Sequence, residues 1–374
     1  MQGAAGPKTA AEMPAPEEKT QHMWHKKIVL IAATAFLATG LTACSDDKSG
    51  GSDAASDGSL TKVKIALSNQ ANQSYLPLIL ASRMGYFKKQ GLDVQIVNLQ
   101  GTPQVSDALL NGQVQGMIGF FDHNLDLQAK GKDTKAVVQL LQAPGMVEMT
   151  RSNESSLKSP GDLRGKNVGV TSLGSASSTI GSYLAVHNNI PLNQTHLVAV
   201  AAGPTFVAAF QHNRVDAGVT TEPTISTLLK KHLGTIVADM RTAAGTKAAL
   251  GGPYPGTALT VQTSWEQTHQ ATTQKMVNAI YQTLQWMESH SAAQITAQVP
   301  ADFYSGSGKD QYVQALANEM GMYNPTGQMP ADAPQTVLRV LDAVDPAVKG
   351  HKIDLAKTYT DEYVQKAAQE KSAS

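Results

Sequence analysis

The chain has 374 residues, of which 41% are hydrophobic and 16% are charged. From Cys44 onward it carries 26 Lys and Arg against 27 Asp and Glu, a balance that argues against nucleic acid as a partner. Cys44 is the only cysteine, so the rest of the chain forms no internal disulfide and no thiolate metal site. The roughly 315 residues after the N-terminal region exceed what one core usually organises, so we expect two lobes.

The N-terminal segment has the layout of a secretory signal. Lys26 and Lys27 precede an apolar stretch at 28–37, and Leu41-Thr42-Ala43-Cys44 places small residues before a cleavage point. The apolar stretch is too short to be a permanent membrane span. Residues 41–44 resemble a bacterial lipobox, which implies a signal peptide at 23–43 and lipidation of Cys44. The alternative is an uncleaved leader followed by a structural cysteine.

The segments on either side of this signal differ from it in composition. Residues 1–22 are rich in Pro, Glu and Gln and match no basic leader, so we expect translation to start at Met23 and residues 1–22 to be a mis-assigned extension. Residues 44–59 are mostly Gly, Ser and Asp, with nothing to bury, and are predicted to form a flexible tether. The folded body then begins near Leu60.

Hydrophobic spacing predicts alternating strands and helices along the body, because a period of two indicates a strand and a period near 3.6 a helix. Strands are predicted at 63–67, 92–97, 115–120, 136–141, at the end of 163–170, and at 197–201, 217–220 and 236–239, with helices at 75–87, 105–110, 175–188 and 207–212. After 264 the pattern is helical, with apolar stripes at 276–287 and 337–341. This alternation predicts α/β layers with parallel strands, whose ligands bind beyond the carboxyl ends of the strands.

Four patches of sequence occur in an order that resembles a known family. They are Tyr75 to Val94, Gly101 to Met117, Asp162 to Ser175, and Ala208 to Pro223. Together they cover about residues 60 to 225. Their order resembles the periplasmic nitrate-, sulfonate- and taurine-binding proteins of ABC importers, which are similar to the proteins of thiamine-pyrimidine precursor synthesis.

The resemblance implies an α/β periplasmic-binding-protein fold with two lobes that close by a hinge motion. Lobe 1 would be residues 60–144 and 258–374, and lobe 2 would be residues 145–257. The two hinge crossings would fall near 143–145 and 253–256, which are rich in Gly and Pro. The resemblance also implies a monomeric bacterial lipoprotein in the periplasm or at the cell surface. Its partners would be a small-molecule ligand, an ABC permease and the permease's ATPase.

Loops that follow the predicted strands supply the first candidate ligand contacts. Gln70, Asn72 and Tyr75 follow the first strand and offer amides and a ring, or they form an ordinary capping loop. Phe121, Asp122 and His123 follow the third strand. For these three, the alternative is a helix-capping Asp122 beside a solvated His123.

The second lobe supplies the remaining candidates. Its first helix opens with small residues, whose free amides and positive dipole end favour an anion, and the resemblance makes this the anion-binding turn. The residues of this turn are Gly174, Ser175, Ala176, Ser177 and Ser178. N-capping by Ser175 is compatible with that role. Gly203 and Glu222 end later strands, and Glu222 either accepts a hydrogen bond from the ligand or caps the next helix.

The function predicted is capture of a small organic monoanion by a protein that is not an enzyme. The monoanion would be a sulfonate or a carboxylate, with an aromatic or amine-bearing body among the options. The candidate loops contain no Lys or Arg to hold a dianion, and an uncharged or cationic heterocycle is the alternative ligand. The related synthases imply an iron-binding cysteine segment and a lysine near the first loop, and 68–75 has neither. We therefore predict no cofactor and no metal. A thiamine-precursor protein and a sensor lipoprotein remain alternatives.

Overall fold

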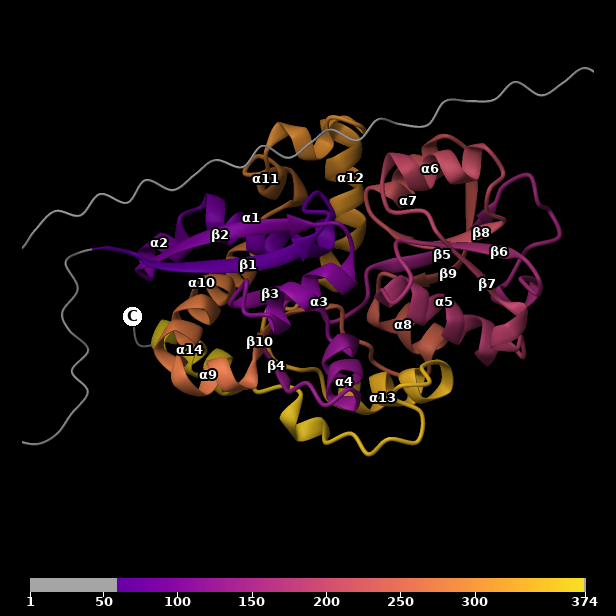
Figure 1. Cartoon of the computed structure of the whole chain (residues 1–374). Coiled ribbons are helices and arrows are strands. Elements are labelled where there is room, and N and C mark those ends of the chain that lie inside the picture. The colour runs from indigo at the N-terminus through magenta and orange to yellow at the C-terminus, as the bar shows by residue number, and fades with distance from the viewer. Residues whose placement is uncertain (1–58, 373–374) are drawn as a thin grey trace, which may run out of the picture. The chain divides into compact units, whose positions relative to one another are not determined.

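The computed structural model describes residues 59–372, which form two five-stranded sheets with helices packed around them (Figure 1). The first sheet has the strand order β2-β1-β3-β10-β4 and the second has the order β7-β6-β8-β5-β9. The strands of the first sheet are β1 (Thr61–Ser68), β2 (Leu92–Leu99), β3 (Gly116–Phe120), β4 (Thr134–Gln139) and β10 (Thr257–Gln262). Those of the second sheet are β5 (Met146–Arg151), β6 (Asn167–Val170), β7 (His196–Ala199), β8 (Ala217–Thr221) and β9 (Gly234–Met240).

Helices follow most strands and continue alone after β10. The α-helices are α1 (Leu76–Arg83), α2 (Tyr86–Lys89), α3 (Thr102–Leu110), α4 (Asp122–Ala129), α5 (Ala176–His187), α6 (Pro204–Gln211), α7 (Thr224–Lys230), α8 (Ala243–Leu250), α9 (Thr263–Thr268), α10 (Gln270–Glu288), α11 (Ala292–Thr296), α12 (Lys309–Glu319), α13 (Ala333–Val344) and α14 (Glu362–Ser372). Short 3₁₀ turns are η1 (Gln73–Tyr75), η2 (Pro160–Asp162), η3 (Leu192–Gln194), η4 (Ala301–Tyr304), η5 (Met320–Met322) and η6 (Leu355–Lys357). The predicted α/β class is confirmed.

The prediction that all strands are parallel is wrong for β5 and β10, which the hydrophobic pattern did not predict. β5 runs antiparallel to β8 and β9, and β10 runs antiparallel to β3 and β4. Each of these strands follows a segment that passes from one sheet to the other. The chain enters the new sheet at the side where the parallel strands have their carboxyl ends. The entering strand therefore runs in the direction opposite to theirs.

The predicted apolar stripes lie in two large cores. Met276, Ile280, Leu284 and Met287 of α10 are buried against the first sheet. A second cluster, here called the interface core, takes side chains from both sheets and from α13. It includes Phe121 from the first sheet's side, Val219 and Tyr183 from the second, and Leu341 of α13. The two sheets are therefore joined by shared apolar packing as well as by the chain.

Two segments connect the sheets, residues 140–145 and 251–256, and they are bonded to each other. The backbone N–H of Gly256 donates to the carbonyl of Leu141 at 3.1 Å. The buried side-chain amide of Gln139 lies 3.0 Å from the carbonyl oxygens of both Leu141 and Gly256. A third segment joins them, because the N–H of Gln142 donates to the carbonyl of Met322 at 2.8 Å.

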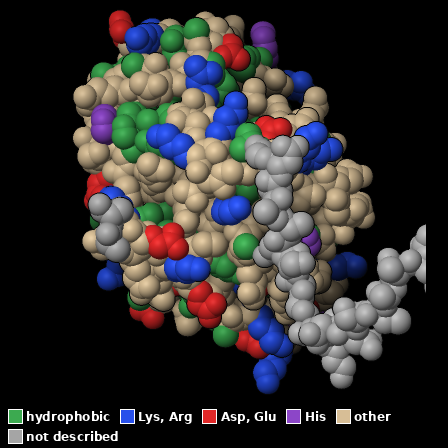
Figure 2. Space-filling view, turned by 90° about the vertical axis from the view of Figure 1, so that its left-hand side faces the viewer, with side chains coloured by type: hydrophobic (Ala, Val, Ile, Leu, Met, Phe, Trp, Pro, Cys, Tyr) green, Lys and Arg blue, Asp and Glu red, His purple; other side chains and the backbone are tan. Residues whose placement is uncertain are grey.

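Figure 2 shows basic and acidic side chains interspersed over the face that it presents, consistent with the balanced composition. Within residues 59–372, no helix is long and apolar enough to cross a membrane. The predictions for 1–22, for the signal at 23–43, for Cys44 and for all but the last residue of the tether lie outside the described residues.

The paired crossing segments predict that Gly256→Ala destabilises the protein. A Cβ atom at Gly256 would lie 2.8 Å from both the carbonyl oxygen of Ala143 and Cβ of Leu141, so backbone would have to shift. We expect the free energy of unfolding to fall by about 1–3 kcal/mol in chemical denaturation. Gly321→Ala is the matched control, since nothing lies within 4 Å of its added Cβ. Equal stability of the two variants would contradict the proposed packing.

Candidate functional site

Loops at the carboxyl ends of both sheets line three cavities of about 470, 420 and 360 Å³, here called the first, second and third cavity. Thr102 lines the first and third cavities, while Asn69 and Ala202 line the second and third. The cavities therefore follow one another along a single cleft between the sheets. The two sides of this cleft touch where Gly101 faces Ser172, since a Cβ on Gly101 would lie 3.4 Å from the Ser172 hydroxyl.

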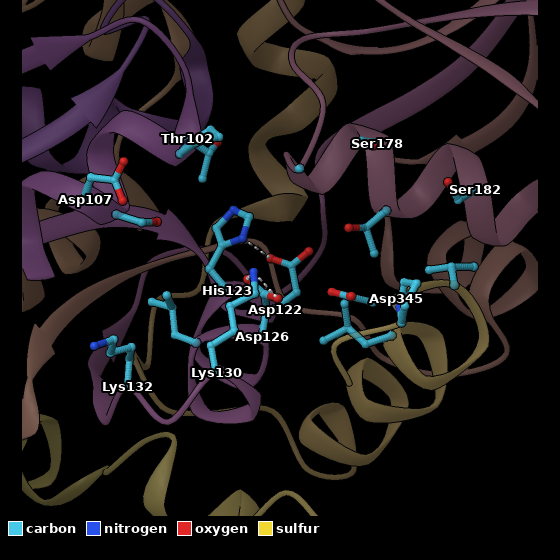
Figure 3. Close-up of a pocket in the computed structure, with 18 of the residues that line it drawn as sticks. Thr102, Asp107, Asp122, His123, Asp126, Lys130, Lys132, Ser178, Ser182 and Asp345 are labelled. Carbon is cyan, nitrogen blue, oxygen red and sulfur yellow. Dashed lines mark hydrogen bonds and ion pairs between the residues drawn. The ribbon is translucent and has the colours of Figure 1, made fainter. Parts of the chain in front are cut away.

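The first cavity lies between α3 and α4 on the first sheet's side, α5 on the second sheet's side, and α13 (Figure 3). Asp122 and His123 stand at the start of α4, and Ser178 and Ser182 come from α5 across the cavity. Leu341 and other apolar side chains of α13 close one side. The cavity thus has polar groups on opposite walls and an apolar side, as small-molecule sites usually do.

Asp122 and His123 form a buried polar pair with open hydrogen-bonding positions. They are 1% and 7% exposed. Asp122 Oδ2 accepts a hydrogen bond from the Tyr254 hydroxyl at 2.9 Å, and Asp122 Oδ1 lies 3.5 Å from His123 Nδ1. Among the described residues, neither Asp122 Oδ1 nor His123 Nε2 has a hydrogen-bond partner. A buried polar atom without a partner costs about 1–3 kcal/mol, so a ligand or water that reached either atom would stabilise it.

The local sequence explains why this pair is held at the cavity. β3 ends at Phe120, and Asp122 lies in the first turn of α4, where the helix dipole stabilises a carboxylate. Tyr254 is fully buried, and burial followed by the Asp122 charge raises its pKa well above the usual 10. Its hydroxyl therefore stays protonated and donates to Asp122. Tyr254 lies in the segment that connects α8 to β10, so the first cavity is bonded directly to a crossing between the sheets.

The serines at the start of α5 divide between capping and cavity lining. Ser175 Oγ accepts from the Ser178 N–H at 3.4 Å, donates to the Ser172 carbonyl at 2.7 Å and contacts the Ser177 hydroxyl at 2.9 Å. Ser175 and Ser177 are thus committed to the cap, and Ala176 is 2% exposed in the interface core. Gly174 and Ser178 line the first cavity.

Gly203 and Glu222 line the second cavity, away from Asp122. The Gly203 N–H donates to Thr224 Oγ1 at 3.0 Å. The Glu222 carboxylate accepts from the N–H and the hydroxyl of Ser226, both at 2.9 Å, so the capping role considered for it is present. Burial raises the pKa of Glu222, opposed by the Ser226 bonds and by Arg241. The predicted contacts therefore fall into two cavities.

The other predicted residues are engaged locally. Asn72 Oδ1 caps η1 by accepting from the Ser74 N–H at 2.9 Å, and the Gln70 N–H donates to Asn98 Oδ1 at 3.1 Å. Tyr75 is 6% exposed, with its hydroxyl 3.1 Å from that of Ser68. Phe121 is fully buried in the interface core, edge-on to the Tyr359 ring. We assign Phe121 to packing, because no part of its ring is exposed.

The structure also adds charged residues that the loop analysis missed. Lys130 and Lys132 line the first cavity and Lys231 lines the second, although the predicted loops themselves contain no Lys or Arg. Lys130 pairs with Asp126 at 2.7 Å. Lys130 could have been found from the sequence, because it lies about two helical turns after Asp122 and would share its side of a helix. That inference required predicting α4, which the sequence analysis did not do. Asp345, which follows α13, also lines the first cavity.

Comparison with known proteins gives a consistent picture. Residues 58–301 match the model of the NMT1-like family. A solved protein from Bordetella bronchiseptica RB50 is 30% identical with a TM-score of 0.78, covering 83% of this chain and 98% of that one. The Bacillus subtilis protein named "Putative binding protein YtlA" is 27% identical over 274 residues, 72% of this chain and 75% of YtlA.

A weaker match is the 4-amino-5-hydroxymethyl-2-methylpyrimidine phosphate synthase THI11 of Saccharomyces cerevisiae. It is 25% identical over 164 residues, which cover 44% of this chain and 47% of the synthase. The chain therefore matches about half of that enzyme. The two-sheet architecture is the periplasmic-binding-protein fold, shared with periplasmic nitrate- and sulfonate-binding proteins. The resemblance noted in the sequence is confirmed.

The Asp122–Tyr254 bond predicts that Tyr254→Phe destabilises the protein. Removing the hydroxyl leaves the buried Asp122 carboxylate without this donor, so the free energy of unfolding should fall by about 1–3 kcal/mol. Tyr281→Phe is the control, because Tyr281 is equally a core tyrosine. In a double-mutant cycle with Asp122→Asn, the two losses should be less than additive. Additive losses would show that the pair is not coupled.

Proposed function

Because this chain belongs to the NMT1-like family, we propose that it acts outside the cytoplasmic membrane as the solute-binding component of an ABC importer. The observation that carries the proposal is the first cavity, in which buried Asp122 and His123 present open hydrogen-bonding atoms toward a cleft between two sheets. A cleft between two lobes at the ends of their strands is where an α/β protein binds small molecules.

The ligand proposed is a small organic monoanion that also carries a hydrogen-bond donor, such as an amine or hydroxyl. Its acid group would lie at Gly174 and Ser178, where the start of the twelve-residue helix α5 favours negative charge. Its donor would reach Asp122 Oδ1, and its body would contact His123 and the apolar wall at Leu341. The two ends of such a ligand match the two polar walls of the first cavity.

Charge in the first cavity opposes a dianion more strongly than a monoanion. Lys130 is already paired with Asp126, which leaves Asp107, Asp122 and Asp345 among the lining residues to oppose a second negative charge. Lys132 supplies one further positive charge. The acidic lining also favours the cationic or uncharged heterocycle considered above, so the ligand screen below includes both classes.

Binding without catalysis is supported by the match to YtlA and by the composition of the chain. The synthase match covers less than half of that enzyme, and the sequence after Cys44 contains no cysteine for an iron segment of the kind implied by that resemblance. The open atoms of Asp122 and His123 suit recognition of a ligand. The same geometry would serve a sensor. A permease gene encoded next to the gene of this protein would favour the importer component over a sensor.

We propose further that Cys44 anchors a monomeric protein to the membrane through covalent lipid. Cys44→Ala should abolish incorporation of labelled palmitate in the bacterial host, because the thiol and the new amino terminus are the acylation sites. Multiple acyl chains hold a protein stably, whereas one does not. A Cys44→Ala variant that still incorporates label would rule out this anchor.

A thermal-shift screen of the full chain in detergent tests the ligand class. The panel is sulfonates, aromatic carboxylates, amines and pyrimidines, because any compound that binds only the folded state raises the melting temperature. We expect amine- or hydroxyl-bearing monoanions to give the largest shifts. A response confined to cations or neutral heterocycles would contradict the acid-group assignment at α5.

The hit from the screen is then measured against Ser178→Asp by calorimetry. This change puts a negative charge at the start of α5, so the affinity for an anion should fall at least about fivefold, corresponding to about 1 kcal/mol. Ser178 is preferred to Ser175 because Ser175 maintains the cap. Ser156→Asp, on an exposed turn of the second sheet's side, is the control. An unchanged affinity in Ser178→Asp would place the acid group elsewhere.

A further inference from the structure

The charges that line the first cavity differ in how far they are buried. Asp122 is 1% exposed, and Asp126 and Asp345 are half-buried. Lys130 and Lys132 line the same cavity, but both are exposed. Water and salt screen exposed charges much more than buried ones. The carboxylates therefore have more influence inside the first cavity than the lysines at its edge.

The two atoms of the first cavity's lining that lack partners are both suited to accept hydrogen bonds. Asp122 Oδ1 and His123 Nε2 have no partner among residues 59–372, and their side chains are 1% and 7% exposed. A carboxylate oxygen only accepts. His123 Nδ1 lies 3.5 Å from Asp122 Oδ1, which favours the proton on Nδ1 and leaves Nε2 as an acceptor. A ligand that reaches this end of the cavity must therefore supply donors.

Asp345 brings a further carboxylate to the first cavity from the C-terminal tail, beyond the residues that match the family (Figure 3). Its Oδ1 atom accepts a hydrogen bond from the Ala347 N–H at 2.9 Å, which orients the carboxylate. α13, which Asp345 follows, is held on the second sheet's side, because Arg339 Nη2 donates to the Leu250 carbonyl at 3.0 Å. The acidic groups of the cavity thus come from two separate helices, α4 and α13.

A hydroxyl and an ammonium group would interact differently with this set of acceptors. A hydroxyl donates one hydrogen bond, whereas an ammonium group donates three. Hydrogen bonds to ionised groups are also stronger than those between neutral groups. Removing an ammonium group from water is costly, and nearby carboxylates offset that cost. The lining therefore favours an ammonium group over a hydroxyl.

We propose that the first cavity selects a ligand with a cationic nitrogen, and that Asp345 determines this specificity. The inference rests on the proposed function and narrows it, because it replaces a donor that is either an amine or a hydroxyl with an ammonium group. The ligand is then a zwitterion. Its acid group lies at the start of α5, and its ammonium group lies against Asp122, His123 and Asp345.

Calorimetry on the full chain in detergent at pH 7 tests this inference with two pairs of compounds. One pair is homotaurine and the corresponding hydroxypropanesulfonate, and the other is para-aminomethylbenzoate and para-hydroxymethylbenzoate. The members of each pair share the acid group and the body and differ in the ammonium or hydroxyl group. We expect the amine to bind at least about tenfold more tightly than its hydroxyl partner in the pair that fits the cavity.

Asp345→Asn then tests the residue itself. Asn keeps an oxygen that can accept from the Ala347 N–H and removes the negative charge. We expect the preference for the amine to fall at least about fivefold, with little change in the affinity for the hydroxyl compound. Asp342→Asn is the matched control, because Asp342 is exposed on α13, does not line the cavity, and accepts from the Gly350 N–H at 3.0 Å through an oxygen that Asn retains. The control should keep the parent's preference.

The comparison in the parent protein tests the inference without any variant. Amines that bind no more tightly than their hydroxyl partners would overturn it, and so would a folded Asp345→Asn variant that keeps the parent's preference. Hydroxyl compounds that bind as well as the amines would leave the proposed solute-binding function in place. Failure of every compound in the wider thermal-shift screen would instead count against that function.

Discussion

Shared apolar packing between the two sheets is the constraint on which the rest of the structure depends. The interface core buries Phe121 and Ala258 from the first sheet's side together with Ile180 and Val219 from the second, and α13 covers both. Burial of a Phe, Ile or Val side chain contributes roughly 1.5–3 kcal/mol. The cluster therefore brings the carboxyl ends of two sheets against each other, and the cleft exists because these ends carry polar loops that cannot pack as tightly as the core.

Bringing polar loops together has an energetic cost that is visible in the buried atoms without partners. Asp122 Oδ1 and His123 Nε2 belong to residues that line the first cavity, and each would gain from a partner atom. A protein that binds and releases a solute needs such atoms, because a cleft whose polar groups were all satisfied internally would gain little on closing.

The C-terminal helices shape the cleft although they lie outside the residues that match the family. α13 supplies the apolar side of the first cavity, and Asp345 follows it into the same cavity. The shape and charge of the first cavity therefore depend on the C-terminal tail as well as on the residues that match the family.

The sequence by itself determined the α/β class, the strand and helix alternation, and the small-residue start of α5, because these depend on local spacing and on backbone chemistry. It also placed Asp122, His123, Gly174 and Ser178 in loops after strands that would face a cleft, together with residues such as Glu222 that the structure puts in another cavity. Only the tertiary structure decided that β5 and β10 run antiparallel, that Phe121 is core, and that Glu222 lies in a different cavity from Asp122. It likewise brought Lys130 to the first cavity and Tyr254 to Asp122. Those contacts join residues up to 132 positions apart, as Asp122 and Tyr254 are, and no local pattern of side chains records which distant segments will share one buried volume.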